Sequence, residues 1–389
     1  MNRITQGQGI RFLLDFWKKE YLHEFIAQGG SKIKFLTGKE GSGKTCALNM
    51  LEEDGKAENY QVCSFSADNV YLNDFSLLYE AIISQIDLLS CLKDCAKQIA
   101  MHVSVHAKDI PDNRTAVDYL TSTGEMSVVL RGEMRDFLND FFLKNPQMDN
   151  AFAQVCALIT ASLLGLISLD EESIDLLTGW MNVRKDIKLA SLKPLGVSPA
   201  RITKFNARHM LRSLCELVRL SGRNGILVLV DDLDIMMSKE GSGSVKYTKM
   251  KRDDSFESIR QLIDDIDTMH NIMFVFAFDR SMIDNEKLGL KSYQALWMRI
   301  QNEIESRRFN CFADIADLDR LARQEYSTEY LMEMSLEFAG EAENQGVHAE
   351  VLNQEQIEEA RRQARYGTYG LPKLIKDFTL NPQEVNANA

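Results

Sequence analysis

A glycine-rich octapeptide near the N-terminus constrains this 389-residue chain more than any other feature. Residues 38–45, GKEGSGKT, satisfy the pattern G-x-x-x-x-G-K-[ST] in full, and they follow a short β-rich run at 33–36. Glycines at these positions let successive backbone N–H groups turn toward one anion, and a helix predicted to continue over 46–51 would present its N-terminus to the same anion. The octapeptide, called the phosphate loop below, therefore predicts a phosphate-binding turn between a strand and a helix.

The residue types in the phosphate loop predict a site for ATP with Mg²⁺. Lys44 would reach the β- and γ-phosphates, and the Thr45 hydroxyl would ligate the metal. The backbone of the loop would wrap the phosphates through Gly38, Gly41, Ser42 and Gly43. We therefore expect Lys44 to be catalytic as well as nucleotide-binding.

A continuous apolar run at 226–230 predicts a buried strand, and it ends in two acids. A magnesium-bound triphosphate needs a carboxylate at the end of a neighbouring strand, which is the place of Asp231. Asp232 follows where a general base can polarise the attacking water. Because Asp is one methylene shorter than the Glu often found there, we expect slow hydrolysis. The alternative is an acidic loop after a core strand.

Four predicted strands frame a long helical region. The strands are expected at 33–36, 61–66, 226–230 and 272–278, with helical patterns between them. This alternation predicts an α/β fold with a parallel sheet, which together with the phosphate loop is a P-loop NTPase core. From about 90 to 205 the pattern is helical and no strand is convincing, and everything after 285 also reads as helix.

Six segments follow from this pattern. They are an N-terminal helical lead-in at 1–30, the first part of the NTPase core at 31–90, a helical insertion at 91–204, the second part of the core at 205–290, a helical C-terminal lid at 291–380 and a flexible tail at 381–389. Within these segments we expect helices at 11–28, at 73–89 with Asn73 as its cap, and at 318–340, and a polar loop at 238–254.

Further residues are candidates for nucleotide contacts. Asp279 ends the strand predicted at 272–278, and it either senses the γ-phosphate or caps the next helix. Lys373 starts the last helix and would contact phosphate from the lid. Three arginines, placed on the helix after this strand, either act as a charge-stabilising finger across a contact in a homo-oligomer or are solvated: Arg299, Arg307 and Arg308.

The net charge of −12 argues against a protein that coats nucleic acid through its overall charge. One stretch has the opposite bias. Residues 184–212 hold eight basic side chains against the single acid Asp186, and they would meet nucleic acid or an acidic partner, or form a solvated face. The eight are Arg184, Lys185, Lys188, Lys193, Arg201, Lys204, Arg208 and Arg212. A smaller cluster, Lys246, Lys249, Lys251 and Arg252, falls in the predicted polar loop.

The cysteines and the longest apolar segment bear on location. Seven scattered cysteines in a chain of this size fit a reducing cytosol, and the N-terminal residues do not resemble a signal peptide. Residues 151–169 carry no charge, but they include polar side chains and lack flanking anchors, so they favour a buried core helix over a membrane span. We therefore expect a cytoplasmic protein with no membrane contact.

Several stretches resemble the ATP-binding P-loop proteins of BREX-type phage-defence systems. The resemblance rests on GSKIKFLTGKEGSGKT, LLTGWMNV, LKPLGVSPARITKFNARHMLRSLCELVRLSGRNGILVLVDDLD and LGLKSYQALWMRI, and it spans about residues 20–376. VDDLD and FVFAFDR are more loosely similar to KAP-type NTPases. The resemblance implies an AAA+ or STAND-like ATPase. Because that family usually has Asp-Glu at Asp231-Asp232, and such proteins often have arginine at Lys373, fast turnover and a lid sensor are less expected here.

The resemblance also implies partners and a role. We expect ATP binding and slow hydrolysis to drive a switch or an assembly step in a prokaryotic antiviral system, together with a protein that acts on DNA, such as a helicase or nuclease of that system. Three alternatives stay open. They are a non-enzymatic ATP-dependent scaffold, a replication-type initiator or helicase loader that binds DNA directly, and a KAP-like signalling ATPase without DNA dependence.

Overall fold

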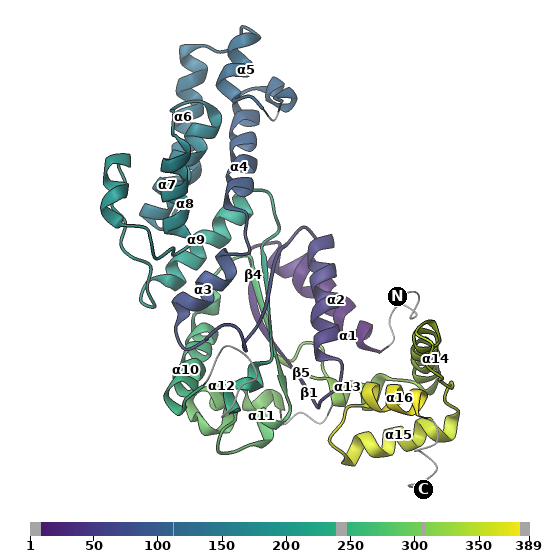
Figure 1. Cartoon of the computed structure of the whole chain (residues 1–389). Coiled ribbons are helices and arrows are strands. Elements are labelled where there is room, and N and C mark those ends of the chain that lie inside the picture. The colour runs from purple at the N-terminus through teal and green to yellow at the C-terminus, as the bar shows by residue number, and fades with distance from the viewer. Residues whose placement is uncertain (1–8, 112, 239–246, 305–307, 382–389) are drawn as a thin grey trace.

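A computed structural model describes residues 9–111, 113–238, 247–304 and 308–381 (Figure 1). Five parallel strands form one sheet in this part of the chain, in the order β2-β3-β4-β1-β5. Their bounds are Ser31–Gly38 for β1, Gln61–Ser66 for β2, Ile226–Asp231 for β3, Ile272–Asp279 for β4 and Ile315–Asp317 for β5. The predicted parallel α/β core is confirmed, and β4 lies between the strand of the phosphate loop and the strand of the acid pair.

The register brings the functional strand ends to one edge. Gly38 pairs with Asp279, and Ser66 pairs with Asp231, so that the carboxyl ends of β1 to β4 lie at the same side of the sheet. All four predicted strands are present in the structure. They could be predicted because each contains a run of β-forming residues several positions long. Strand β5 was missed, since its three residues give no measurable periodicity and only pairing with β1 defines it.

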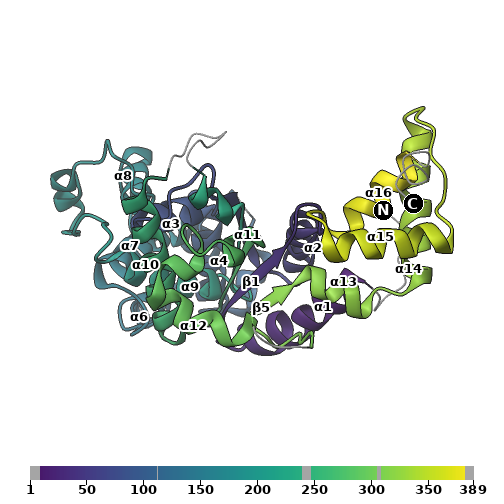
Figure 2. The same ribbon diagram turned by 90° about the horizontal axis from the view of Figure 1, so that it is seen from below.

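One face of the sheet is covered by helices near the N-terminus and by the helix that follows β5, and the last helices of the described chain lie beside it (Figure 1). Alternate strand residues such as Leu229 and Val275 point into an apolar cluster that runs from Ile10 to Phe378. The helices on or beside this face are α1 (Ile10–Trp17), the π-helix η1 (Lys18–Ile26), α2 (Lys44–Ala57), α13 (Leu318–Glu325), α14 (Thr328–Asn344), α15 (Gln354–Tyr366) and α16 (Leu371–Leu380). The last three, called the C-terminal helices below, lie at one end of the molecule in both views (Figures 1 and 2).

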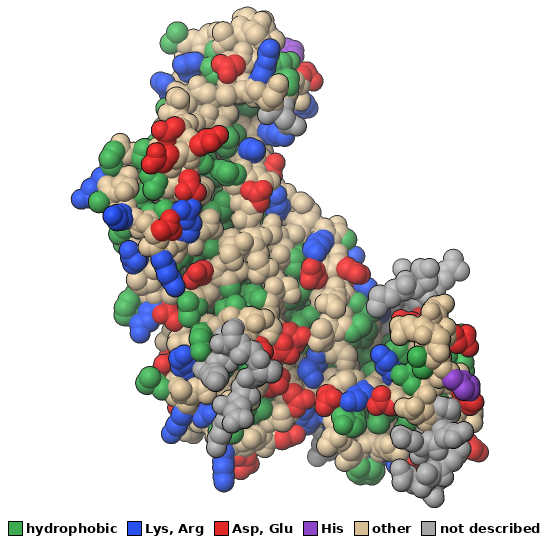
Figure 3. Space-filling model, viewed as in Figure 1, with side chains coloured by type: hydrophobic (Ala, Val, Ile, Leu, Met, Phe, Trp, Pro, Cys, Tyr) green, Lys and Arg blue, Asp and Glu red, His purple; other side chains and the backbone are tan. Residues whose placement is uncertain are grey.

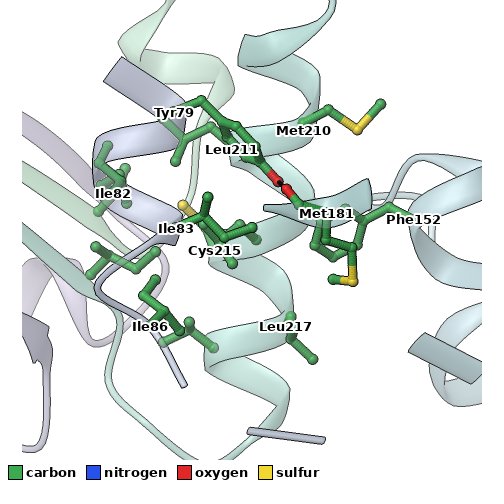
Figure 4. Close-up of a cluster of buried hydrophobic side chains, with 14 of the residues drawn as sticks. Tyr79, Ile82, Ile83, Ile86, Phe152, Met181, Met210, Leu211, Cys215 and Leu217 are labelled. Carbon is green, nitrogen blue, oxygen red and sulfur yellow. Dashed lines mark hydrogen bonds between the residues drawn. The ribbon is translucent and has the colours of Figure 1, made fainter. Parts of the chain in front are cut away.

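The opposite face carries the helical insertion. A second, larger apolar cluster joins the sheet to the helices of the insertion and to helices outside it. The insertion holds α4 (Leu88–Val103), α5 (Ala116–Ser122), α6 (Val128–Phe142), α7 (Asn150–Leu164) and α8 (Glu171–Met181). Outside it lie α3 (Phe75–Ile83), α9 (Ala207–Leu220), α10 (Lys249–Asp265) and α12 (Gln294–Ile304). Figure 1 shows α4 to α8 rising away from the sheet. Figure 4 shows the junction, where Ile83 of α3 meets Cys215 of α9, and the Tyr79 hydroxyl donates to the Met181 carbonyl at 3.0 Å.

Two predicted helices are each two helices in the structure, because an internal residue caps a new one. The helix predicted at 73–89 ends at Ile83, and Asp87 caps α4; the N-cap of α3 is Asp74 and not Asn73. The helix predicted at 318–340 is interrupted, and Ser327 caps α14 by accepting the N–H of Tyr330. Asp and Ser side chains compete for helix N–H groups in this way, which periodicity alone does not reveal.

The predicted polar loop at 238–254 is partly wrong. Helix α10 begins at Lys249, where the Thr248 hydroxyl accepts the N–H of Lys251. Residues 249–254 are all polar except Met250, and of them only Arg252 is buried, so no apolar periodicity marked this first part of the helix. Residues 239–246 of the predicted loop, with its GSGS tetrapeptide and Lys246, lie outside the described residues, as do most of the predicted tail and part of the predicted lead-in.

The apolar segment at 151–169 forms α7 and the turn after it, and α7 is largely buried among the other helices of the insertion. No single helix among the described residues is long and apolar enough to cross a membrane. Helices α3 and α4 reach the required length and composition only when joined across their 67° bend, and both belong to the larger apolar cluster. No strand lies between α3 and α9, as the sequence predicts for this described stretch.

Candidate functional site

The phosphate loop presents a ring of unpaired backbone donors. Gly41 and Gly43 have φ of +72° and +97°, values that other residues rarely adopt. In the described structure, the backbone N–H groups of Gly41, Gly43, Lys44 and Thr45 have no hydrogen-bond acceptor. The last two open helix α2, whose N-terminus carries a partial positive charge. Orphaned donors at a helix N-terminus fit a phosphate group.

The two reactive side chains of the loop are held against neighbouring strand ends. Lys44 Nζ donates to the carbonyls of Gly38 at 2.9 Å and Lys39 at 3.0 Å, and it lies 3.7 Å from the Asp279 carboxylate. The Thr45 hydroxyl donates to Asp231 Oδ2 at 2.7 Å. A hydroxyl and a carboxylate in direct contact fit the oxygen ligands that Mg²⁺ prefers. The structure thus brings Lys44, Thr45, Asp231 and Asp279 together.

The two acids at the end of β3, Asp231 and Asp232, contact different neighbours. Asp232 adopts a left-handed conformation with φ of +57°, and its N–H donates to Asp231 Oδ1 at 2.8 Å. Ser66, at the end of β2, donates its hydroxyl to Asp232 Oδ2 at 2.7 Å. The second carboxylate therefore faces β2, while the first contacts Thr45. Sequence reasoning missed Ser66, although its position as the polar last residue of a predicted strand was a usable signal.

Asp234 supports the end of β4. Its Oδ1 accepts the backbone N–H of Asp279 at 2.7 Å, and burial raises the pKa of the Asp234 carboxyl above its ordinary value. The side chain of Asp279 accepts the N–H of Ser281 at 2.9 Å, so it stabilises the start of the next helix while its other oxygen faces Lys44. The two predicted roles of Asp279, sensing the γ-phosphate and capping the next helix, are both compatible with this geometry.

The C-terminal helices contact the phosphate loop directly. The Glu40 carbonyl accepts the N–H of Gly370 at 2.8 Å, and the Gly41 carbonyl accepts the N–H of Lys373 at 3.1 Å. Lys373 Nζ donates to the Glu40 carboxylate at 2.7 Å and lies 3.8 Å from the centre of the Tyr369 ring. The bond to Glu40 raises the pKa of Lys373. Lys373 therefore lies at the loop with its amine engaged by a loop side chain, and its contact with phosphate stays a prediction.

A second contact uses Lys39. Its Nζ donates to the carbonyls of Ala364 at 2.8 Å and Gly367 at 2.6 Å, at the end of α15. Its backbone N–H donates to Asp319 at 2.8 Å, and burial raises the pKa of the Asp319 carboxyl. Lys39 and Glu40 occupy unspecified positions of the octapeptide pattern, which is why the pattern did not single them out. The carbonyls of Glu40 and Gly41 and the side chains of Lys39 and Glu40 thus contact the C-terminal helices, while the unpaired N–H groups of the loop remain for an anion.

Of the three predicted arginines, Arg299 is held away from this cluster. Arg299 Nε pairs with Asp264 of α10 at 3.1 Å. Arg308 follows α12 and does not lie on it, because the helix ends at Ile304; the prediction that places it on that helix is wrong. Arg307 lies outside the described residues. A finger acts across a subunit contact, so the role of all three stays a prediction.

The comparisons with known proteins give one family. The model of the family described as BREX system ATP-binding protein BrxC/D matches residues 19–364. Neither curated proteins nor solved structures give a significant match. The matched range contains the phosphate loop, both acids of β3 and the whole insertion, and it ends before Lys373.

Proposed function

Because the chain belongs to the family of BREX system ATP-binding proteins, we propose that it is an ATP-dependent switch or assembly factor in a phage-defence system. Its target would be a protein partner of the same system that acts on DNA. One observation carries the proposal: the hydrogen bonds of the C-terminal helices end on Lys39, Glu40 and Gly41 of the phosphate loop. A nucleotide held by this loop would act directly on those bonds.

Binding would use groups that the structure leaves available. The N–H groups of Gly41, Gly43 and Thr45 would donate to phosphate oxygens, and Lys44 would exchange its two loop carbonyls for phosphate. Thr45 and Asp231 would hold Mg²⁺, which neutralises charge on the β- and γ-phosphates. The exchange at Lys44 would remove one hydrogen bond from each of the carbonyls of Gly38 and Lys39. These two carbonyls also accept the N–H groups of Arg280 and Ser42, respectively. The geometry of the loop would therefore change next to the residues that contact the C-terminal helices.

Hydrolysis would be slow. Asp232 would orient the attacking water, but its carboxylate is short and is already bound by Ser66. This same contact favours the second candidate, a scaffold in which bound ATP fixes the shape without multiple turnovers. When both are equally saturated with ATP, a slow ATPase releases phosphate over many turnovers, whereas a scaffold does not.

The strand order supports an AAA+ or STAND-like core. Strand β4 separates the loop strand β1 from the acid strand β3, and helices α14 to α16 follow the edge strand β5 as a helical lid. Assembly into a homo-oligomer would give Arg299, Arg307 and Arg308 a neighbouring active site to act on. A cytoplasmic location belongs to the same proposal.

The test compares Lys44→Ala with Lys56→Ala, a change on the same helix at an exposed lysine that pairs with Glu52. Calorimetric titration with Mg-ATP should show affinity lost about 100-fold or more for Lys44→Ala and unchanged for Lys56→Ala. Asp232→Asn keeps an acceptor for Ser66 but no base, so it should bind ATP and release phosphate more slowly than the natural chain. Phosphate release that survives both site changes would refute the ATPase, and binding without any multiple-turnover release would establish the scaffold.

A further inference from the structure

The structure divides the eight basic residues of the 184–212 stretch into two groups. Three are held by partners within the protein: Arg184 by Asp175 and Asp186, Arg208 by Asp265, and Arg212 by Gln147. The carboxylate of Asp186, the single acid of the stretch, is bound by Arg184 through both oxygens. These three arginines and the acid therefore serve the protein's own packing.

The other five basic residues remain available to a ligand. All are exposed, and none forms an ion pair with the described residues: Lys185, Lys188, Lys193, Arg201 and Lys204. They lie in the connection between α8 and α9, called the basic segment below (residues 185–205). Figure 3 shows several Lys and Arg side chains, with Asp and Glu side chains among them, along the edge of the molecule where the connection after α8 lies in Figure 1. The acids that open α8, Glu171 and Glu172, lie about 15 Å along its axis from the last residue of that 11-residue helix, where the connection begins.

An aromatic side chain completes the basic segment. Phe205 is 89% exposed, which is unusual for a residue of its size, and Lys204 Nζ lies 5.3 Å from the centre of its ring. A ring with a free face beside a cation is the arrangement on which nucleic-acid bases stack. Charge alone would fit any polyanion, whereas this ring adds a face on which an unpaired base can stack.

The basic segment is held in a defined shape by its own packing. Trp180 donates its ring N–H to the carbonyl of Ala200 at 3.0 Å, and the N–H of Thr203 donates to Asn206 at 2.7 Å. Leu192 and Val197 are fully buried beneath it. The cations therefore project from a fixed backbone, and binding need not first order the connection.

We infer that the basic segment binds single-stranded nucleic acid. Lys185, Lys188, Lys193 and Arg201 would contact successive phosphates, and Phe205 would stack on an unpaired base. The net charge of −12 leaves this segment as a local site and gives no general attraction for nucleic acid elsewhere. The inference goes beyond the proposed function and does not depend on it, because no residue of the phosphate loop takes part.

The test is fluorescence anisotropy of a labelled 20-nucleotide single strand, and of its duplex, titrated with the full chain. Lys188→Glu/Lys193→Glu should weaken binding of the single strand at least tenfold at low salt and reduce the salt slope by about 1.4, since each phosphate contact on a single strand contributes about 0.7. Phe205→Ala should weaken it about fivefold or more, and Phe205→Trp should restore it. Each double variant is first checked for a normal thermal transition.

The matched control is Lys93→Glu/Lys287→Glu, which makes the same charge change elsewhere on the protein. Lys93 lies on α4 and Lys287 follows α11 (Ser281–Asp284), and both are exposed and form no ion pair with the described residues. Its affinity should stay within twofold of the natural chain. Equal losses in the control and in the segment variant would overturn the inference. Duplex binding as tight as that of the single strand and indifferent to Phe205→Ala would also overturn it, as would equal competition by polyglutamate, which would instead indicate an acidic protein partner. Lys44→Ala should bind the strand normally, so failure of the ATP site leaves this test intact.

Discussion

The C-terminal helices and the helical insertion both extend from the sheet, but they are attached to it by different contacts. The C-terminal helices add to their apolar packing a set of hydrogen bonds that end on the phosphate loop, at Lys39, Glu40 and Gly41. The insertion meets the sheet through one continuous apolar cluster, with the buried bond from Tyr79 to Met181 inside it. The first attachment lies beside the anion site and the second does not.

This difference indicates which region can respond to nucleotide. Hydrogen bonds to loop carbonyls change when the loop rearranges around phosphate, and each contributes only about 1 kcal/mol net. Apolar burial is insensitive to an anion and contributes about 25 cal/mol per Å². We therefore expect the C-terminal helices to report the state of the site and the insertion to act as a fixed arm that carries the basic segment.

The largest expected effect comes from breaking the apolar attachment. Leu211 of α9 is fully buried among the residues of Figure 4, and Leu211→Ala should lower the free energy of unfolding by about 2–5 kcal/mol. Denaturant titration measures it. Leu336→Ala, on α14 and 60% exposed, should stay within about 0.5 kcal/mol of the natural chain. Equal losses at the two positions would contradict the apolar attachment.

A smaller effect is expected from displacing the C-terminal helices. A Cβ at Gly41 would lie 2.3 Å from the Cβ of Lys373, and φ is +72°. Gly41→Ala should cost about 1–2 kcal/mol for the backbone and a further ~1–3 kcal/mol for the overlap. Gly124→Ala, at φ +77° with nothing within 4 Å, should cost the backbone part alone.

Hydrogen exchange without nucleotide localises this effect. In Gly41→Ala the amides of α16 should exchange faster while those of α9 keep their protection, because the overlap falls on the C-terminal helices. Faster exchange in both helices, or in neither, would show that the two attachments do not differ as described.

The smallest expected effect concerns Asp234, next to the site. Because burial raises its pKa in the folded state, its ionisation opposes folding, and this penalty appears as the pH rises through the raised value. Asp234→Asn keeps the acceptor for the Asp279 N–H and cannot ionise. Its unfolding free energy relative to the natural chain should therefore rise between about pH 4 and pH 7, measured by denaturant titration at each pH. A difference that falls with pH for Asp234→Asn would contradict the assignment.

Much of the core was readable from local sequence. The octapeptide at 38–45, the apolar runs of β3 and β4, and the acids Asp231 and Asp279 at their ends all follow from patterns a few residues long. Parallel strands end at one edge, so the sequence alone placed these groups on the same side of a sheet. The comparison with the BREX system ATP-binding family confirmed the resemblance that the same stretches carry.

Only the tertiary structure decided what each of these groups touches. Glu40 and Lys373 are 333 positions apart, and Ser66 and Asp232 are 166 apart, so no local periodicity could join them. Strand β5 is too short to be predicted from periodicity, and only its pairing with β1 defines it. In the basic stretch, the ion pair of Arg208 with the distant Asp265 shows that this arginine is not available to a ligand. The sequence by itself determined the phosphate loop and the sheet edge that it serves, because those depend on short-range geometry. Contacts between distant segments depend on how the helices pack, and they alone determined that the loop is joined to the C-terminal helices.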